Sequence, residues 1–164
     1  MDIESFWNLI KKSRRGAEDC DEQAENLAAL LIRLEPQEVA EFDRHMRQHL
    51  VEAYRWDLWA VAYIINGGCS DDCFEYFRGW LIAQGKEYFE AALLNPENAA
   101  KRVSAGGEVE CESILYAASE AYEQKTGEQL PVSGIRQSSE PEGQEWEEDK
   151  VEQLYPKLAK KFGW

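Results

Sequence analysis

Basic residues, histidines and cysteines are scarce in this sequence, and each shortage narrows the possible functions. Its 164 residues contain 18 lysines and arginines against 32 aspartates and glutamates, which gives a net charge of −14. A surface of that charge repels phosphate, so neither nucleic acid nor an anionic membrane is an expected partner. The four cysteines form no dense framework, which indicates a reducing cytoplasm and cysteines that remain thiols.

Long apolar segments are also missing. The longest run without a charged residue, Leu58 to Ser70, has 13 residues, and a membrane-spanning helix needs ~18 or more. The opening residues Met1 to Glu4 are acidic and are not followed by the apolar stretch of a signal peptide. We therefore expect a cytoplasmic protein with no membrane association.

The residues that are present indicate a folded helical domain. Hydrophobic residues make up 44% of the chain and aromatic residues 12%, which is too much for a disordered chain. Apolar residues recur with the spacing of amphipathic helices, and no segment alternates with the period of a strand. The predicted fold is all-α, one compact domain of about seven to nine helices. The predicted helices are one that ends before Gly16, then 21–34, 36–54, 56–65, 71–84, 86–94, 110–125 and 151–162, with extra turns within 97–103.

The composition divides this domain into three parts. Residues 1–130 are expected to form the helical core. Residues 131–149 mix proline, glycine and serine with acidic residues, which predicts an irregular acidic loop pinned by Trp146. Residues 150–164 are expected to form a C-terminal helix that packs back on the core, with Pro156 kinking it or starting its last part.

The segment 56–80 carries the densest combination of polar and aromatic side chains. One interpretation is an aromatic-walled pocket in which Arg78 binds an anion or the aspartates bind a cation. The other is a junction between helices, in which Ser70 caps the second helix and Arg78 pairs with Asp57 or Asp71. The candidate ligand-binding residues are Trp56, Asp57, Trp59, Asn66, Ser70, Asp71, Asp72, Arg78 and Trp80.

The only two histidines lie four residues apart on one helix face, in a row formed by Glu41, His45, His49 and Glu52. Such a row is able to present two imidazoles and a carboxylate to a divalent metal. Met46 stands where a zinc protease has its glutamate, so that motif is absent. The same spacing is also explained by weak acid–imidazole pairs on a helix surface. We expect no cofactor.

Cys69 precedes a predicted helix and lies four positions before Cys73, which is not the spacing of a redox pair. A thiolate at a helix N-terminus is able to act as a nucleophile if a histidine lies near it in space. The alternative is a small buried side chain.

Several segments together resemble a known family. The chain is similar to the bacterial helical proteins of the domain of unknown function 4240 family. The similarity lies in residues 56–74 and 77–85, the pair Phe6-Trp7, the stretch Tyr122 to Gly127 and the segment Tyr155 to Leu158. The resemblance implies a helical fold but no catalytic residues, and the regulatory modules joined to some related domains imply regulation or interaction.

Acidity and the lack of a catalytic motif favour a protein-interaction or regulatory domain whose acidic surface binds a protein partner, and the charge favours a basic one. The alternative is a small-molecule-binding protein or an enzyme that uses the segment 56–80. No pair of nucleophile and base is recognisable, so the sequence leans away from an enzyme.

Overall fold

The computed structural model describes residues 1–164, and the fold is all-α, as predicted. It contains no strand, and the only bridge of the β type joins Arg55 to Glu142. The α-helices are α1 (Ile3–Arg14), α2 (Cys20–Leu31), α3 (Pro36–Glu52), α4 (Trp56–Asn66), α5 (Asp71–Ala83), α6 (Lys86–Leu94), α7 (Ala117–Thr126) and α8 (Pro156–Lys161). Three short 3-10 helices, η1 (Pro96–Ala100), η2 (Ser113–Tyr116) and η3 (Glu148–Gln153), complete the fold.

Local sequence signals determine where the helices begin and end. The side chain of Asp19 accepts a hydrogen bond from the backbone N–H of Glu22, and that of Ser70 accepts one from Cys73. Each therefore satisfies an amide that has no partner inside its helix. α4 ends at Gly67, whose φ of 67° is the left-handed conformation that glycine adopts without strain.

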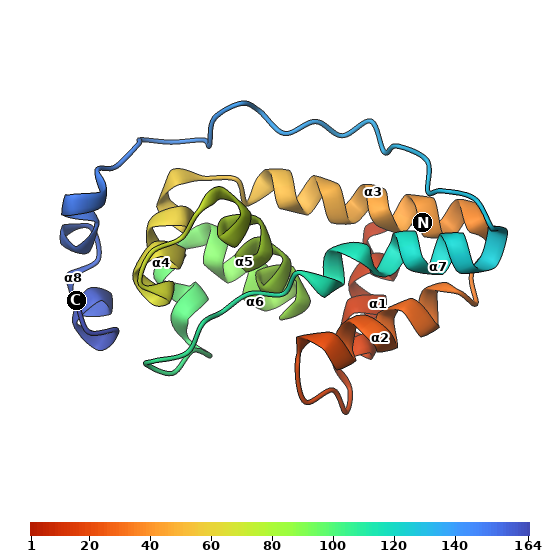
Figure 1. The fold of residues 1–164 in the computed structure, drawn as a ribbon, viewed down its shortest axis with the longest axis horizontal. Coiled ribbons are helices and arrows are strands. Elements are labelled where there is room, and N and C mark those ends of the chain that lie inside the picture. The colour runs from red at the N-terminus through yellow and green to blue at the C-terminus, as the bar shows by residue number, and fades with distance from the viewer.

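The helices enclose one hydrophobic core of 39 buried residues. The long helix α3 runs along one side of the molecule, with α1, α2 and α7 at one end and α4, α5 and α6 at the other (Figure 1). α4 is apolar on nearly all sides and is mostly buried, as the sequence predicted. No helix of the molecule is both long enough and apolar enough to span a bilayer.

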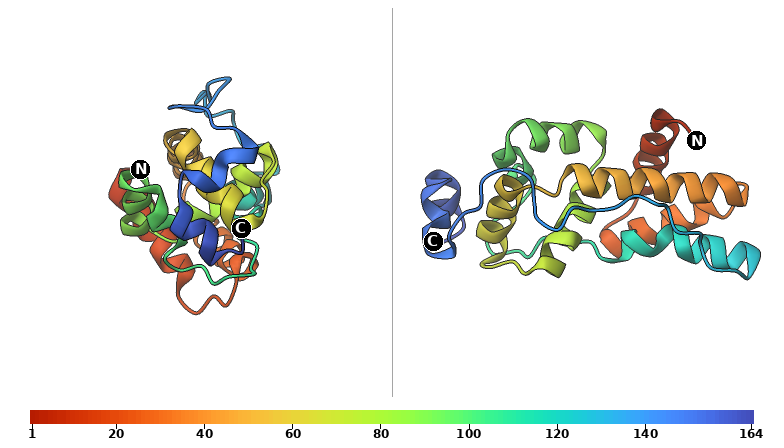
Figure 2. Two further views of the ribbon diagram at one scale, coloured as in Figure 1. Left: turned by 90° about the vertical axis from the view of Figure 1, so that its left-hand side faces the viewer. Right: turned by 90° about the horizontal axis from the view of Figure 1, so that it is seen from above.

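An extended segment, residues 128–147, connects α7 to the C-terminal helices. It starts at the end of α7, follows the outside of α3 and reaches the far end of the molecule near α4 (Figures 1 and 2). We call it the strap. Trp146 fastens it, because its indole N–H donates a 2.7 Å hydrogen bond to the carbonyl of Trp56. The C-terminal segment then packs on α4, and the indole N–H of Trp164 donates to the carbonyl of Ile64 at 2.8 Å.

Two predicted helices differ from the structure. The predicted helix at 151–162 is two elements, η3 and α8, because Pro156 has no N–H to continue a helix and starts α8 instead. The predicted helix at 110–125 begins only at Ser113, as the 3-10 helix η2, and becomes the α-helix α7 at Ala117. Before it, the N–H of Cys111 donates to the carbonyl of Tyr76 at 2.9 Å, which draws this part of the chain onto α5.

The cysteines are paired, contrary to the expectation of free thiols. Cys20 forms a disulfide with Cys111, and Cys69 forms one with Cys73, so no free cysteine is left. Cys69 is therefore not positioned as a nucleophile. The first pair lies 91 residues apart in the sequence, and its spacing therefore contained no sign of the partnership.

Candidate functional site

Arg78 is the largest fully buried side chain, with 2% of its surface exposed. Its Nη1 donates to the carbonyl of Leu50 at 2.7 Å and to Oε1 of Gln137 in the strap at 2.9 Å. Its guanidinium carbon also lies 4.7 Å from the ring centroids of both Tyr54 and Phe74. Leu50 lies in the last turn of α3, where carbonyls have no partner inside the helix. Arg78 therefore joins α3, α5 and the strap.

No carboxylate forms an ion pair with this buried cation. The expected pairing of Arg78 with Asp57 or Asp71 does not occur, and only carbonyl oxygens and ring faces surround the charge. Burial lowers the pKa of Arg78 to about 10, an effect that the charges of Glu75 and Asp71 partly oppose. Arg78 thus remains charged at neutral pH and acts as a structural connection.

The other polar residues of the segment 56–80 also have structural partners. Asp57 accepts two hydrogen bonds from Arg55, at 2.6 and 3.1 Å. Asn66 exchanges two hydrogen bonds with the backbone of Val109 and so holds the loop before η2. Ser70 is the N-cap described above, and Asp71 and Asp72 are exposed in the first turn of α5. This arrangement supports the junction interpretation.

The aromatic candidates pack against one another and do not enclose a shared cavity with these groups. Trp56 stacks on Trp59 at 5.4 Å, and Trp59 stacks on Phe74 at 5.0 Å, with the edge of Trp146 against the first two rings. Trp80 lies apart from them, against Phe77 and Tyr88. The predicted pocket residues therefore do not converge.

Two members of the histidine row, Glu41 and His45, contact Met1. The amino group of Met1 forms an ion pair with Glu41, and Nε2 of His45 donates to the Met1 carbonyl at 2.9 Å. His49 is buried and stacks on Phe6, with centroids 5.0 Å apart. Its Nδ1 donates to the His45 carbonyl at 2.6 Å. Burial lowers the pKa of His49, so it is held neutral.

Glu52, the last member of that row, lies apart from these contacts and lines a shallow cavity beside Arg55. No group of three or more histidine, cysteine, aspartate or glutamate side chains in the structure is arranged to hold a metal ion.

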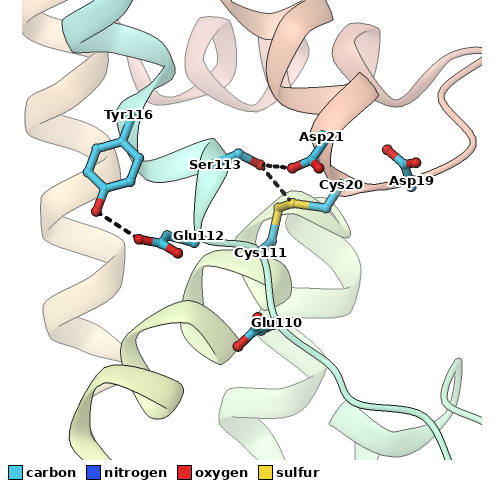
Figure 3. A pocket seen from close by; sticks show the side chains of 8 residues that line it. All are labelled: Asp19, Cys20, Asp21, Glu110, Cys111, Glu112, Ser113 and Tyr116. Carbon is cyan, nitrogen blue, oxygen red and sulfur yellow. Dashed lines mark hydrogen bonds between the residues drawn. A yellow bond between two sulfur atoms is a disulfide. The ribbon is translucent and has the colours of Figure 1, made fainter.

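A different cavity, of about 500 Å³, lies where α2 begins beside η2. We call it the acidic cavity. Figure 3 shows the Cys20–Cys111 disulfide near its centre, with carboxylates on several sides of it. The lining residues are Asp19, Cys20, Asp21, Glu110, Cys111, Glu112, Ser113 and Tyr116. They include four carboxylates and no cation.

Hydrogen bonds fix part of this lining. The hydroxyl of Ser113 donates to Oδ1 of Asp21 at 2.7 Å and lies 3.2 Å from the sulfur of Cys20. The hydroxyl of Tyr116 donates to Oε1 of Glu112 at 3.2 Å, and this bond raises the pKa of Tyr116. Tyr116 is still 46% exposed, so it offers an aromatic surface beside the carboxylates.

The sequence analysis did not identify this cavity, although the sequence contains a signal for it. Each cysteine of the disulfide stands between two acidic residues, in Asp19-Cys20-Asp21 and in Glu110-Cys111-Glu112. Joining the cysteines necessarily brings the four carboxylates together.

These features define a class: a single helical domain with a cavity that four carboxylates and no cation line. The family model described as "Protein of unknown function (DUF4240)" matches residues 1–124 of the 164, and the chain belongs to this family. The matched region contains the whole lining of the acidic cavity, whereas Gln137 and Trp146 of the strap lie beyond it. No curated protein and no solved structure matches the chain.

Proposed function

We propose that this protein is an interaction or regulatory domain that binds a basic segment of a partner protein at the acidic cavity. The observation that carries the proposal is the set of four carboxylates around one cavity that no lysine or arginine lines. A lysine or arginine side chain entering the cavity relieves their mutual repulsion, and this complementarity favours both affinity and selection of basic partners.

The cavity is also built to bind without rearranging. The disulfide joins two of its walls, and Ser113 holds Asp21 in place. A site that is already ordered loses less conformational entropy when it binds. The exposed ring of Tyr116 adds a surface on which an arginine side chain is able to stack.

The net charge of the protein supports the same proposal. A chain with charge −14 attracts a basic partner over a distance and speeds their encounter at low salt. This attraction alone is not specific, so the carboxylates of the cavity are expected to contribute more than acidic residues elsewhere.

Fluorescence anisotropy with a labelled arginine-rich octapeptide tests the proposal. The double variant Glu110→Gln/Glu112→Gln is expected to bind the peptide at least about tenfold more weakly than the unaltered protein. The matched control, Glu140→Gln/Glu145→Gln, removes the same charge from exposed positions of the strap and is expected to change binding less than about twofold. Equal weakening by both variants would show attraction by net charge alone and would refute a site at the cavity.

A further inference from the structure

A second cavity, of about 340 Å³, lies where α1 meets the connection between α5 and α6. α1 starts on the same side of α3 as α6 (Figure 2). Four cations and two carboxylates line this cavity, namely Lys11, Arg14, Lys86, Arg102, Glu4 and Glu87. The lining therefore carries a net positive charge, although the whole chain has 32 acidic and only 18 basic residues. We call it the basic cavity.

Most of these cations have no carboxylate partner. Lys86 forms an ion pair with Glu4 at 2.7 Å. Lys11, Arg14 and Arg102 form no ion pair, since the five pairs of the structure involve other residues. The one other carboxylate of the lining is Glu87, so three unpaired cations against one carboxylate leave the cavity with an excess of two positive charges.

The two arginines are held close together. Nη1 of Arg14 and Nη1 of Arg102 both donate to the carbonyl oxygen of Gln84, at 2.9 and 3.2 Å. The guanidinium of Arg102 also lies over the ring of Tyr88, 4.5 Å from its centroid. The Tyr88 hydroxyl accepts from the backbone N–H of Arg102 at 3.1 Å. Both guanidinium groups are thus positioned before any ligand arrives.

Trp7 brings a further hydrogen-bond donor to the lining of the basic cavity. It is only 5% exposed and lines the basic cavity, yet its indole N–H donates no hydrogen bond within the protein. Trp59, Trp146 and Trp164 donate to backbone carbonyls, whereas Trp56 and Trp80, like Trp7, donate to none. No fully buried polar side-chain atom lacks a partner, so the N–H of Trp7 is not sealed inside the core and is free to donate to a ligand oxygen.

We propose that the basic cavity binds the phosphate group of a small molecule, with Arg14, Arg102 and the indole N–H of Trp7 as its donors. Arginine forks match the geometry of phosphate oxygens, and a dianion balances two guanidinium charges where a monoanion balances one. Lys86 and Glu87, which also line the cavity, begin α6 without a side-chain cap, so the amides of this first turn add positive potential, whereas the N–H of Gly85 already donates to the carbonyl of Ile82. This site is separate from the acidic cavity, and its test is independent of the proposed function.

Titration with inorganic phosphate, followed by two-dimensional NMR of the indole N–H groups at constant ionic strength, tests the proposal. The Trp7 signal, assigned with a Trp7→Phe variant, is expected to shift in a saturable way with phosphate and not with acetate. Equal shifts with acetate, or no shift of this signal, would overturn the site. A parallel titration with glycerol phosphate separates the sources: tighter binding identifies an organic phosphate, equal binding identifies the free ion, and both support the site.

Paired variants on α1 test the donors by calorimetry. Arg14→Gln is expected to weaken phosphate binding at least about tenfold, because it removes a charge-assisted donor. Arg15→Gln, one residue further on, removes the same charge outside the cavity and is expected to leave affinity within about twofold. Equal affinity of the two variants, with unchanged circular dichroism, would contradict the proposal.

Discussion

Replacing Arg78 by alanine tests the central connection of the fold. The change removes three hydrogen bonds from a charged donor, to Leu50, to Gln137 and, at 3.3 Å, to the carbonyl of Phe74. The two shorter bonds, to Leu50 and Gln137, are worth ~1.5–3 kcal/mol each. The change also removes the contact with two aromatic rings, worth ~1–2 kcal/mol, and leaves a cavity in the core. Relief of the cost of burying a guanidinium offsets several kcal/mol of this loss.

We expect Arg78→Ala to lower the free energy of unfolding by about 3–5 kcal/mol, measured by urea denaturation followed by circular dichroism. For a chain of this length, each kcal/mol corresponds to a fall of about 2–4 °C in melting temperature. Gln137→Ala removes one of the three acceptors of Arg78 and is expected to cost ~1–2 kcal/mol. Arg44→Ala, which removes an exposed 3.3 Å bond from Arg44 to the strap, is expected to cost less than ~0.5 kcal/mol.

The reasoning is refuted if Arg78→Ala costs less than about 1 kcal/mol, or no more than Gln137→Ala. Either result would mean that the guanidinium contributes little beyond its contact with the strap. If the lost stability equals that of the Gln137 contact, the hydrogen bond from Arg78 to Leu50 contributes little. In that case hydrophobic packing alone holds α3 and α5 together.

Three further predictions concern other parts of the core. Gly79→Ala is expected to destabilise the protein by ~1–3 kcal/mol in urea denaturation, because the new methyl carbon would lie 2.9 Å from the backbone oxygen of Cys111. The control Gly107→Ala places its methyl carbon at an ordinary contact distance and is expected to change stability by less than ~0.5 kcal/mol. Cys20→Ser in oxidised protein is expected to cost about 4–5 kcal/mol, since the disulfide closes a long loop; a thiol titration that finds these cysteines already reduced would contradict this value. Lowering the pH from 7.5 to 5.5 is expected to reduce the free energy of unfolding through His49. Burial lowers the pKa of His49 in the folded protein, so the unfolded chain takes up the proton first as the pH falls. His49→Phe should flatten the pH dependence of the unfolding free energy.

The helices themselves were predictable because their signals are local. Caps such as Ser70, the stop at Gly67 and the apolar spacing of each helix all act within a few residues. These local signals place most boundaries within a few residues of the structure. The failures occur where a distant contact competes, as at Cys111, which is bound to Cys20 and to the backbone of Tyr76 and so does not start a helix.

The candidate sites were less predictable, for the same reason. The expectation for Arg78 assumed a nearby aspartate, whereas the partners that join it to α3 and to the strap lie 28 and 59 residues away in the sequence. The histidine row lies on one helix, as predicted. Its contacts with Met1 depend on where Met1 lies relative to α3, and the sequence of α3 alone does not contain that information. The acidic cavity depends on a disulfide, and only the repeated pattern of acid, cysteine and acid hinted at it.

The Cys20–Cys111 disulfide also determines how the molecule responds to mechanical force. Tension applied at the two ends of the chain passes through this covalent bond and bypasses the segment between Cys20 and Cys111, which lie 91 positions apart and enclose α2 to α6. Pulling an oxidised molecule therefore extends only the first residues and those after Cys111. Reduction releases the enclosed segment and adds about 300 Å to the fully stretched length, at ~3.3–3.6 Å per residue. The hydrophobic centre around α4 and α5 is thus shielded from load by a single bond.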